Sequence, residues 1–185
     1  MRAAGDGPDF VTVDGGEGGT GAAPLEFSNS VGMPLRDALA RVDDALRRHG
    51  LRDQVSVIAS GGLLSGFHLA RAMALGADVC CSARGMMLAL GCVQSLLCNT
   101  NECPTGIATQ HAGLSRGLDV IDKRERVASF HRHTVQVLAE LTGAAGLDHP
   151  QRLHRGLIYR RVSQSQVNTY AELYPPVDAA PAAGG

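Results

Sequence analysis

Apolar residues fall into short β-branched runs and longer helical stripes along the first half of the chain. Apolar positions at helical spacing over 35–48 and 64–75 predict two helices. Each helix lies between two short runs that precede a glycine-containing turn and are typical of strands. These runs are Phe10–Asp14, Val55–Ala59 and Ala77–Ser82. Strands that alternate with helices in this way predict parallel βαβ units, and therefore an α/β fold.

The second half of the chain has a different pattern of apolar residues. The stretch Asp122–Leu141 carries apolar residues at helical spacing and predicts one long helix. Residues 153–162 are expected to be extended, and Ser163 is the expected N-cap of a last helix that ends at Tyr174. An open three-stranded parallel sheet leaves two unpaired edges. This deficit of strands indicates that the chain is part of something larger.

Composition and charge narrow the class of protein. The 185 residues are 44% hydrophobic and 4% aromatic, with 23 glycines, which suits an α/β domain with many close backbone approaches. The formal net charge of −1 implies no general attraction to nucleic acid or to an anionic membrane. No apolar run reaches the ~20 residues that cross a bilayer. We therefore expect a cytoplasmic protein with short disordered ends at 1–9 and 176–185.

Three closely spaced cysteines are the strongest chemical signal. Cys92, Cys98 and Cys103 stand at C-x5-C-x4-C spacing, and Pro104 follows the third. Thiolates are soft ligands that select iron–sulfur clusters, zinc or copper(I), and a proline after a cluster cysteine is familiar from iron–sulfur loops. The alternative is that they are small buried side chains. That alternative is favoured for the Cys80–Cys81 pair, whose side chains should face opposite sides of a strand.

Glycine-rich turns follow all three predicted strands. Five glycines occur between Gly15 and Gly21, with Asp14 and Glu17 as polar groups, and this loop is predicted to contact a ligand. The turns Ser60–Gly62 and Ser82–Met86 each precede a helical stretch, where backbone amides and a helix N-terminus can bind an anion. The alternative is a pair of tight turns without a ligand. No Ser–His–Asp arrangement or Walker loop is visible, so no catalytic residue is assigned.

These motifs together resemble the FMN-binding domain of glutamate synthase, over about Phe10 to Pro175. The resemblance is carried by Asp-Gly-Gly-Glu-Gly-Gly-Thr-Gly-Ala-Ala-Pro at 14–24, the Ser60–Gly62 turn, Gly76-Ala-Asp78, Ala89-Leu-Gly-Cys92 and Cys-Asn-Thr-Asn-Glu-Cys-Pro-Thr-Gly-Ile-Ala-Thr-Gln at 98–110. Members of that family fold as a flavin-binding (β/α)8 barrel. The resemblance implies that the strands starting at 10, 55 and 77 correspond to barrel strands 6, 7 and 8. A cysteine-rich loop at 92–110 and C-terminal helices would follow them.

The resemblance also implies a set of cofactors and site residues. The loop 15–21 would line the pocket for the flavin and 2-oxoglutarate, and Cys92, Cys98 and Cys103 would hold a 3Fe-4S cluster. The family reaction joins ammonia and 2-oxoglutarate, and reduced FMN delivers hydride to the imine to give glutamate. The resemblance does not identify the electron donor. The cofactor-binding residues expected from the resemblance are Gly15, Gly16, Gly18 and Gly19 in the first loop, and Gly61, Gly62, Arg84 and Gly85 around the FMN phosphate.

The main departure from the family pattern is length. Strands 1–5 of the barrel are missing, and a barrel closes only with all of its strands. We therefore expect a C-terminal portion that is inactive alone and that needs a missing N-terminal half or associates with itself. One alternative is an iron–sulfur electron-transfer or structural module without catalysis. Another is a different phosphate-binding barrel, such as one that resembles inosine-monophosphate dehydrogenase, although the cysteine triplet argues against it.

Overall fold

The computed structural model describes residues 7–18, 23–24, 26–27 and 29–177 of the chain. Gly19 and Gly21 of the glycine-rich loop lie outside the described residues. The same holds for positions 1–6 of the expected lead-in and for positions 178–185 of the expected tail. No helix within the described ranges is long and apolar enough to cross a membrane.

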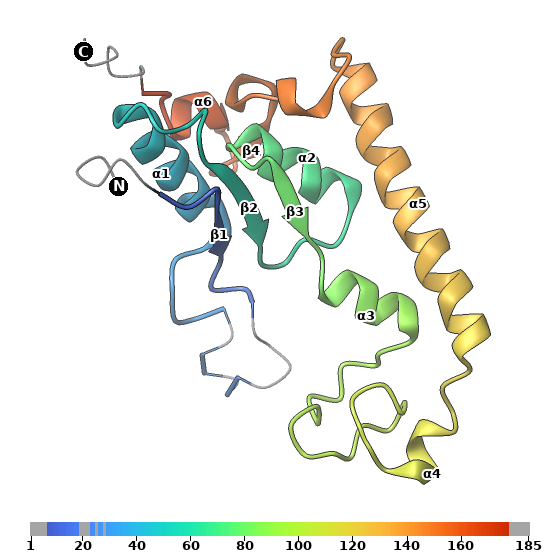
Figure 1. Cartoon of the computed structure of the whole chain (residues 1–185). Helices are drawn as coiled ribbons and strands as arrows, with labels where there is room; N and C mark the ends of the chain where they lie inside the picture. The colour runs from blue at the N-terminus through green and yellow to red at the C-terminus, as the bar shows by residue number, and fades with distance from the viewer. Residues whose placement is uncertain (1–6, 19–22, 25, 28, 178–185) are drawn as a thin grey trace.

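A three-stranded parallel sheet forms the centre of the molecule (Figure 1). Its strands β1 (Phe10–Asp14), β2 (Ser56–Ser60) and β3 (Val79–Cys81) lie in chain order. Helix α1 (Leu35–Arg48) joins the first two strands, and helix α2 (Gly66–Ala74) joins the last two. The predicted α/β fold with parallel βαβ units is therefore confirmed, and the predicted strand bounds differ from the observed ones by at most two residues.

The core lies on one face of this sheet. Side chains that alternate along the strands, such as Val13, Val57 and Ala59, pack against Leu39 of α1 and Ala70 of α2. The prediction for α1 is confirmed over its full length, whereas α2 is shorter than the predicted 64–75. Cysteines 80 and 81 point to opposite sides as expected, because Cys80 packs against the core and Cys81 is exposed.

The chain after β3 packs mainly on the helices and not on the strands (Figure 1). Helices α3 (Arg84–Leu90) and α4 (Ala112–Ser115) flank the cysteine loop, and α5 (Val120–Ala144) extends the predicted long helix by a few residues at each end. Figure 1 shows α5 running along α2 and α3, and it contacts both helices. The C-terminal elements are 3-10 helices η1 and η2, strands β4 and β5 and helix α6. Their bounds are Pro150–Arg152, Arg155–Leu157, Tyr159–Arg161, Val167–Thr169 and Tyr170–Leu173.

The C-terminal prediction was wrong between residues 163 and 169. Ser163 does not cap a helix, because β4 and β5 form an antiparallel hairpin whose turn is closed by the Val162 N–H donating to the Gln166 carbonyl at 3.0 Å. The helix begins only at Tyr170. Thr169 is its N-cap and forms a capping box with Glu172. Ser163 and Thr169 are both residues that can cap a helix, and the pairing of β4 with β5 over residues 159–169 leaves only Thr169 at a helix start.

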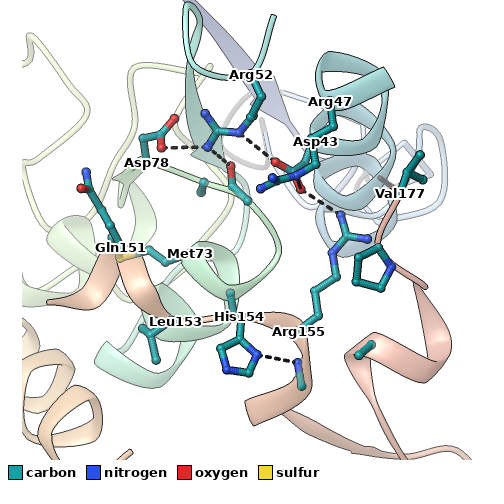
Figure 2. A pocket seen from close by; sticks show the side chains of 16 residues that line it. Asp43, Arg47, Arg52, Met73, Asp78, Gln151, Leu153, His154, Arg155 and Val177 are labelled. Atoms are coloured by element: carbon teal, nitrogen blue, oxygen red, sulfur yellow. Dashed lines mark hydrogen bonds and ion pairs between the residues drawn. The ribbon is translucent and has the colours of Figure 1, made fainter. Parts of the chain in front are cut away.

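A buried carboxylate joins the helices to the C-terminal segment. Asp43 of α1 is 3% exposed and accepts hydrogen bonds from Arg47 at 2.9 Å, Arg52 at 2.8 Å and Arg155 at 3.0 Å. Arg52 also binds Asp78 at 2.8 Å, and Asp78 accepts the Val57 N–H at 2.7 Å. Figure 2 shows these groups converging on Asp43 around a pocket. The buried charges are paired with opposite charges and hydrogen-bonded, which offsets the cost of removing them from water.

Gly76 allows the turn before β3 to approach this carboxylate. A Cβ at position 76 would lie 2.5 Å from the Asp43 Cγ, and the backbone φ of +110° is unfavourable for other residues. The Gly76 carbonyl accepts a hydrogen bond from Arg52 at 3.0 Å. The Gly76-Ala-Asp78 sequence is therefore explained by its contacts with Asp43 and Arg52.

Loss of the Arg155 guanidinium should destabilise the chain strongly. Arg155→Met leaves Asp43 buried with one cation fewer and removes the bond to Asp44, so we expect a loss of about 3 kcal/mol in unfolding free energy. Arg152→Met is the matched control, because its pair with Asp148 is exposed and should contribute at most about 1 kcal/mol. Urea unfolding of both variants measures this. Equal losses would contradict the role of the Asp43 cluster.

Candidate functional site

All three strands of the parallel sheet end at the same edge, and the loops with candidate chemistry leave from it. Figure 1 shows the glycine-rich loop after β1, helix α3 after β3 and the cysteine loop gathered toward this end of the molecule. The C-terminal elements η2 and α6 lie toward the opposite end. Ligand sites of open parallel sheets lie outside the carboxyl ends of the strands. The candidate site is therefore built from the loops at this edge.

The glycine-rich loop packs on the turn after β2. The Gly15 N–H donates to the Ser60 carbonyl at 2.8 Å, and a Cβ on Gly61 would lie 3.1 Å from the Gly15 nitrogen. A Cβ on Gly15 would itself lie 2.6 Å from the Leu35 Cβ. The glycines at 15 and 61 are thus required for close packing of the two turns and of the start of α1, whereas the predicted contact with a ligand stays a prediction.

Glu17 has a structural role that the sequence analysis missed. Its carboxylate accepts the Leu35 N–H at 2.9 Å, at the start of α1. The N-cap residue Pro34 offers no side-chain hydrogen bond there. A carboxylate at a helix N-terminus is favourable because it satisfies an unpaired N–H and interacts with the helix dipole. The signal was not readable locally, since the cap lies 18 residues from the helix it serves.

The turn after β2 differs from its prediction at the helix that follows. Gly61 and Gly62 have φ values of +121° and +65°, but α2 begins only at Gly66. Side chains satisfy part of the N-terminal end of α2. Ser65 accepts the His68 N–H at 3.3 Å, and the His68 Nδ1 accepts the Leu64 N–H at 3.2 Å. Burial, with help from Arg71, lowers the pKa of His68, which favours this neutral accepting form. The glycine turn does not lead directly into α2, so an anion site here would rest mainly on the amides of Gly61 and Gly62.

The turn after β3 reaches the other two loops. The Arg84 Nη2 donates to the Glu17 carbonyl at 3.1 Å, and the Ser82 hydroxyl donates to the Leu63 carbonyl at 2.6 Å. Gly85 is buried, and a Cβ there would meet the Phe130 ring of α5 at 3.2 Å. Glycine at position 85 is therefore explained by the packing of α3 on α5, and this packing is independent of any ligand at the Gly85 amide.

Several backbone N–H groups at this edge find no acceptor among the described residues. Within the part of the chain that the structure describes, the amides of Gly61, Gly62 and Gly85 donate to no protein group. Helix α3 also has no side-chain cap, because its N-cap is Ala83. Buried or half-buried N–H groups are normally paired. A set of unpaired donors at the ends of neighbouring strands can bind an anion. Of the predicted residues, the described contacts bring together Gly15, Gly16, Gly18, Gly61, Gly62, Arg84 and Gly85 at this edge.

The cysteine loop starts from a fixed point at the end of α3. The Gly91 N–H donates to the Leu88 carbonyl at 2.9 Å, and the Cys92 N–H donates to the Met87 carbonyl at 3.0 Å. The Cys92 Sγ accepts the Gln94 N–H at 3.4 Å. Beyond this point, Gln94, Leu96 and Asn101 have positive φ values of 55°, 59° and 65°. Such values are uncommon outside glycine and mark a tightly wound loop.

Cys103 is the cysteine with the most specific surroundings. It is 5% exposed, and its Sγ lies 3.3 Å from the Thr105 hydroxyl. The Thr105 hydroxyl, followed by backbone N–H groups of which Ala108 contributes most, lowers the pKa of the Cys103 thiol to about 7, although burial opposes the shift. By contrast, burial raises the pKa of Cys80 to about 11. Thr105 belongs to the motif at 98–110, but no role for it was predicted from the sequence. Its position two residues after a cysteine was the available signal.

The predicted cluster cysteines are not gathered around one point. Cys92 and Cys98 are half-buried and Cys103 is buried. Among the described residues, no three His, Cys, Asp or Glu side chains come close enough together to hold a metal ion. The donor chemistry nevertheless fits a metal cluster, because three thiols share one loop and one of them is held in a form that favours the thiolate. Metal ligands often come together only when the metal binds.

The pocket around Asp43 lies away from these loops, beside the turns that precede β2 and β3. Its three arginines Arg47, Arg52 and Arg155 are bound by acidic side chains or carbonyls. We therefore assign it a structural role.

Comparison with known proteins places the chain in one family. A family model described as the conserved region in glutamate synthase matches residues 1–148. The chain is 42% identical over 169 residues to the glutamate synthase large subunit-like protein YerD of Bacillus subtilis, which covers 91% of this chain and 32% of the relative. It is 44% identical over 140 residues to the archaeal glutamate synthase (NADPH) of Methanocaldococcus jannaschii, which covers 76% of this chain and 28% of the relative.

A third relative is the ferredoxin-dependent glutamate synthase of Pyropia yezoensis, 37% identical over 106 residues, or 57% of this chain and 7% of the relative. The chain thus spans about a third or less of the length of these curated relatives. The family match extends from the glycine-rich loop through the cysteine loop and along α5. The chain belongs to the glutamate synthase family.

Proposed function

We propose that this chain is the C-terminal part of the flavin and iron–sulfur domain of a glutamate-synthase-type oxidoreductase that acts on a CH-NH2 group. The domain would extend over residues 10–175, with 2-oxoglutarate and an ammonia source as its substrates. The observation that carries the proposal is the set of amide donors at Gly61, Gly62 and Gly85 that find no acceptor among the described residues, joined through α3 to a three-cysteine loop. These donors favour a flavin phosphate site over a cluster module without flavin.

The sheet supports a partial barrel through its uncovered face. Thr12, Ile58 and Val79 are in register across the three strands, on the face opposite to the core, and the Val79 side chain is 50% exposed. Helices α1 and α2, which contact the strands, pack on the core face, although a parallel sheet is normally covered on both faces. Side chains that point to a barrel interior would be covered by the remaining strands. We assign β1, β2 and β3 as strands 6, 7 and 8 of such a barrel.

The phosphate of FMN fits the amide donors at the ends of β2 and β3. The positive φ values of Gly61 and Gly62 turn the backbone so that two successive N–H groups can face one anion. Gly85 adds an amide from the first turn of α3, and Arg84 adds a positive charge close to the glycine-rich loop. In (β/α)8 barrels the loops after strands 7 and 8 frequently bind a phosphate. The loop from Gly15 to Gly18 would then border the flavin and the substrate.

The cysteine loop fits a 3Fe-4S cluster by its donor set. Cys92, Cys98 and Cys103 would supply one thiolate each, and Thr105 with the following amides would stabilise the thiolate of Cys103. When bound, FMN would supply hydride transfer and the cluster would supply electrons. The residues of this chain would hold both groups in place, and we assign none of them as an acid or base.

Completion of the barrel should convert the chain into a flavin-binding protein. Alone, it exposes the edges of β1 and β3 and one sheet face, so we expect self-association and no glutamate formation. Fusion to the N-terminal part of a full-length relative, which would supply the five missing strands, should give a soluble species that carries FMN. Size-exclusion chromatography with a flavin spectrum compares the two proteins. An active, FMN-loaded monomer of the 185-residue chain would refute the partial barrel.

The same fusion allows a matched test of the phosphate site. Gly62→Val adds a branched side chain at a positive φ, so FMN affinity should fall by roughly tenfold or more. Gly143→Val is the control, because a Cβ at that position meets no atom within 4 Å. Unchanged FMN affinity in Gly62→Val would contradict this placement of the phosphate.

Removal of a single cluster ligand should abolish iron binding. Anaerobic reconstitution of the chain with iron and sulfide should give broad visible absorbance and about three irons per chain. Cys98→Ser should lose both signals, whereas Cys80→Ser should keep them, since Cys80 packs against the core. Iron analysis and absorbance measure the outcome. An equal loss of iron from both variants would contradict the assignment of Cys98 as a ligand. Retention of zinc in place of iron would indicate a structural metal site.

A further inference from the structure

Two basic side chains of α5 lie over the start of the cysteine loop. A Cβ built on Gly91 would lie 3.6 Å from the Arg126 Nη1 and 3.7 Å from the Lys123 Nζ. Gly91 directly precedes Cys92 and has a φ of +103°, which is the left-handed end of α3. Lys123 and Arg126 are three residues apart, so they share the face of α5 that carries Phe130 toward α3. Packing of α5 on α3 therefore brings two cations to this position.

Without these two cations, the C-terminal end of α3 would disfavour negative charge. The last carbonyls of a helix carry a partial negative charge, and a thiolate at Cys92 adds a full one. The side chain of Lys123 is only 20% exposed, and its carboxylate partner Asp122 at 3.2 Å is more exposed, at 56%. Arg126 has no acidic partner within the described residues. The three charged side chains of this group thus leave an excess of positive charge beside Cys92.

We propose that Lys123 and Arg126 are positioning residues that compensate the negative charge of the cysteine loop on its Cys92 side. This inference rests on the proposed cluster for its function, but the positive potential at Cys92 does not require a bound cluster. With three thiolates bound, a cluster is anionic, and one further electron makes it more so. Cations fixed at a short distance favour the reduced form. Lys123 and Arg126 would therefore hold the reduction potential of the cluster higher than the loop alone would.

The first test measures the potential at Cys92 in the chain without metal. Iodoacetate is an anion and iodoacetamide is neutral, and both react with the thiolate. The iodoacetate rate divided by the iodoacetamide rate therefore cancels the thiolate fraction, and positive potential at the sulfur raises this ratio. Peptide mass spectrometry gives this ratio for each cysteine. Exposed Cys81, at the end of β3, is the internal reference. The ratio at Cys92 should exceed that at Cys81. Lys123→Gln or Arg126→Gln should each lower it by about threefold, as expected for one unit charge roughly 6 Å away in water-like screening.

Matched variants separate local charge from folding and from net charge. Arg124→Gln removes the same charge from the same helix, but the Arg124 side chain is 71% exposed and paired with Glu125. It should leave the ratio at Cys92 unchanged. Arg126→Lys keeps the charge and should keep the ratio. If Lys123→Gln and Arg126→Gln change the ratio no more than Arg124→Gln does, the proposal is wrong, and the two cations serve only the end of α3.

The second test uses the reconstituted chain. Potentiometric titration should show a lower cluster reduction potential in Lys123→Gln and in Arg126→Gln. The references are the protein without substitutions and Arg124→Gln. An unchanged potential would overturn the proposed effect on the cluster. If the unchanged protein takes up no iron at all, the proposed cluster fails, and the alkylation ratio alone decides whether Lys123 and Arg126 create the positive potential at Cys92.

Discussion

The carboxylate of Asp43 is the interaction on which the arrangement of this chain depends. It lies where α1, the turn before β2, the turn before β3 and the C-terminal segment meet, and it accepts from three arginines. Burial of a charge is costly unless it is paired and hydrogen-bonded, so each neighbouring segment must present a compatible group. That requirement explains Arg52, Asp78 and Arg155 together. It also explains Gly76, since any side chain there would occupy the position of the Asp43 carboxylate.

This network divides the molecule into two ends with different physical properties. Around Asp43, at the end from which β2 and β3 start, charges are paired and the C-terminal segment is fastened to α1 through Arg155. At the carboxyl ends of the strands, amides of Gly61, Gly62 and Gly85 stay unpaired within the described chain. Paired charges are thus gathered at one end, and the groups that can bind ligand are gathered at the other. The same division is found in barrels of parallel strands, whose sites lie at the carboxyl ends.

Local patterns were sufficient to predict the elements that local forces decide. The helix over 35–48 and the strand over 10–14 follow from apolar spacing and flanking turns. The meeting of the glycine turns could also be predicted, because parallel strands end at one edge. Contacts between distant residues were not readable. Asp43 resembles any polar helix residue, Glu17 caps a helix 18 residues away, and β4 pairs with a strand beyond a polar turn. Gly85 is compatible with both an anion site and close packing on Phe130, and only the fold shows the packing.

Helix α3 connects the two proposed cofactor sites. Gly85 lies in its first turn and contributes an amide to the phosphate site, whereas Cys92 follows its C-terminal Gly91 and starts the cysteine loop. Seven residues of helix rise about 10 Å, so the two anchors have a short and fixed separation. Helix α5 contacts α3 near both ends, through Phe130 at Gly85 and through Lys123 and Arg126 at Gly91. Electron transfer between a cluster and a flavin needs a fixed separation. On the proposed assignment, α3 provides it and α5 keeps α3 from shifting.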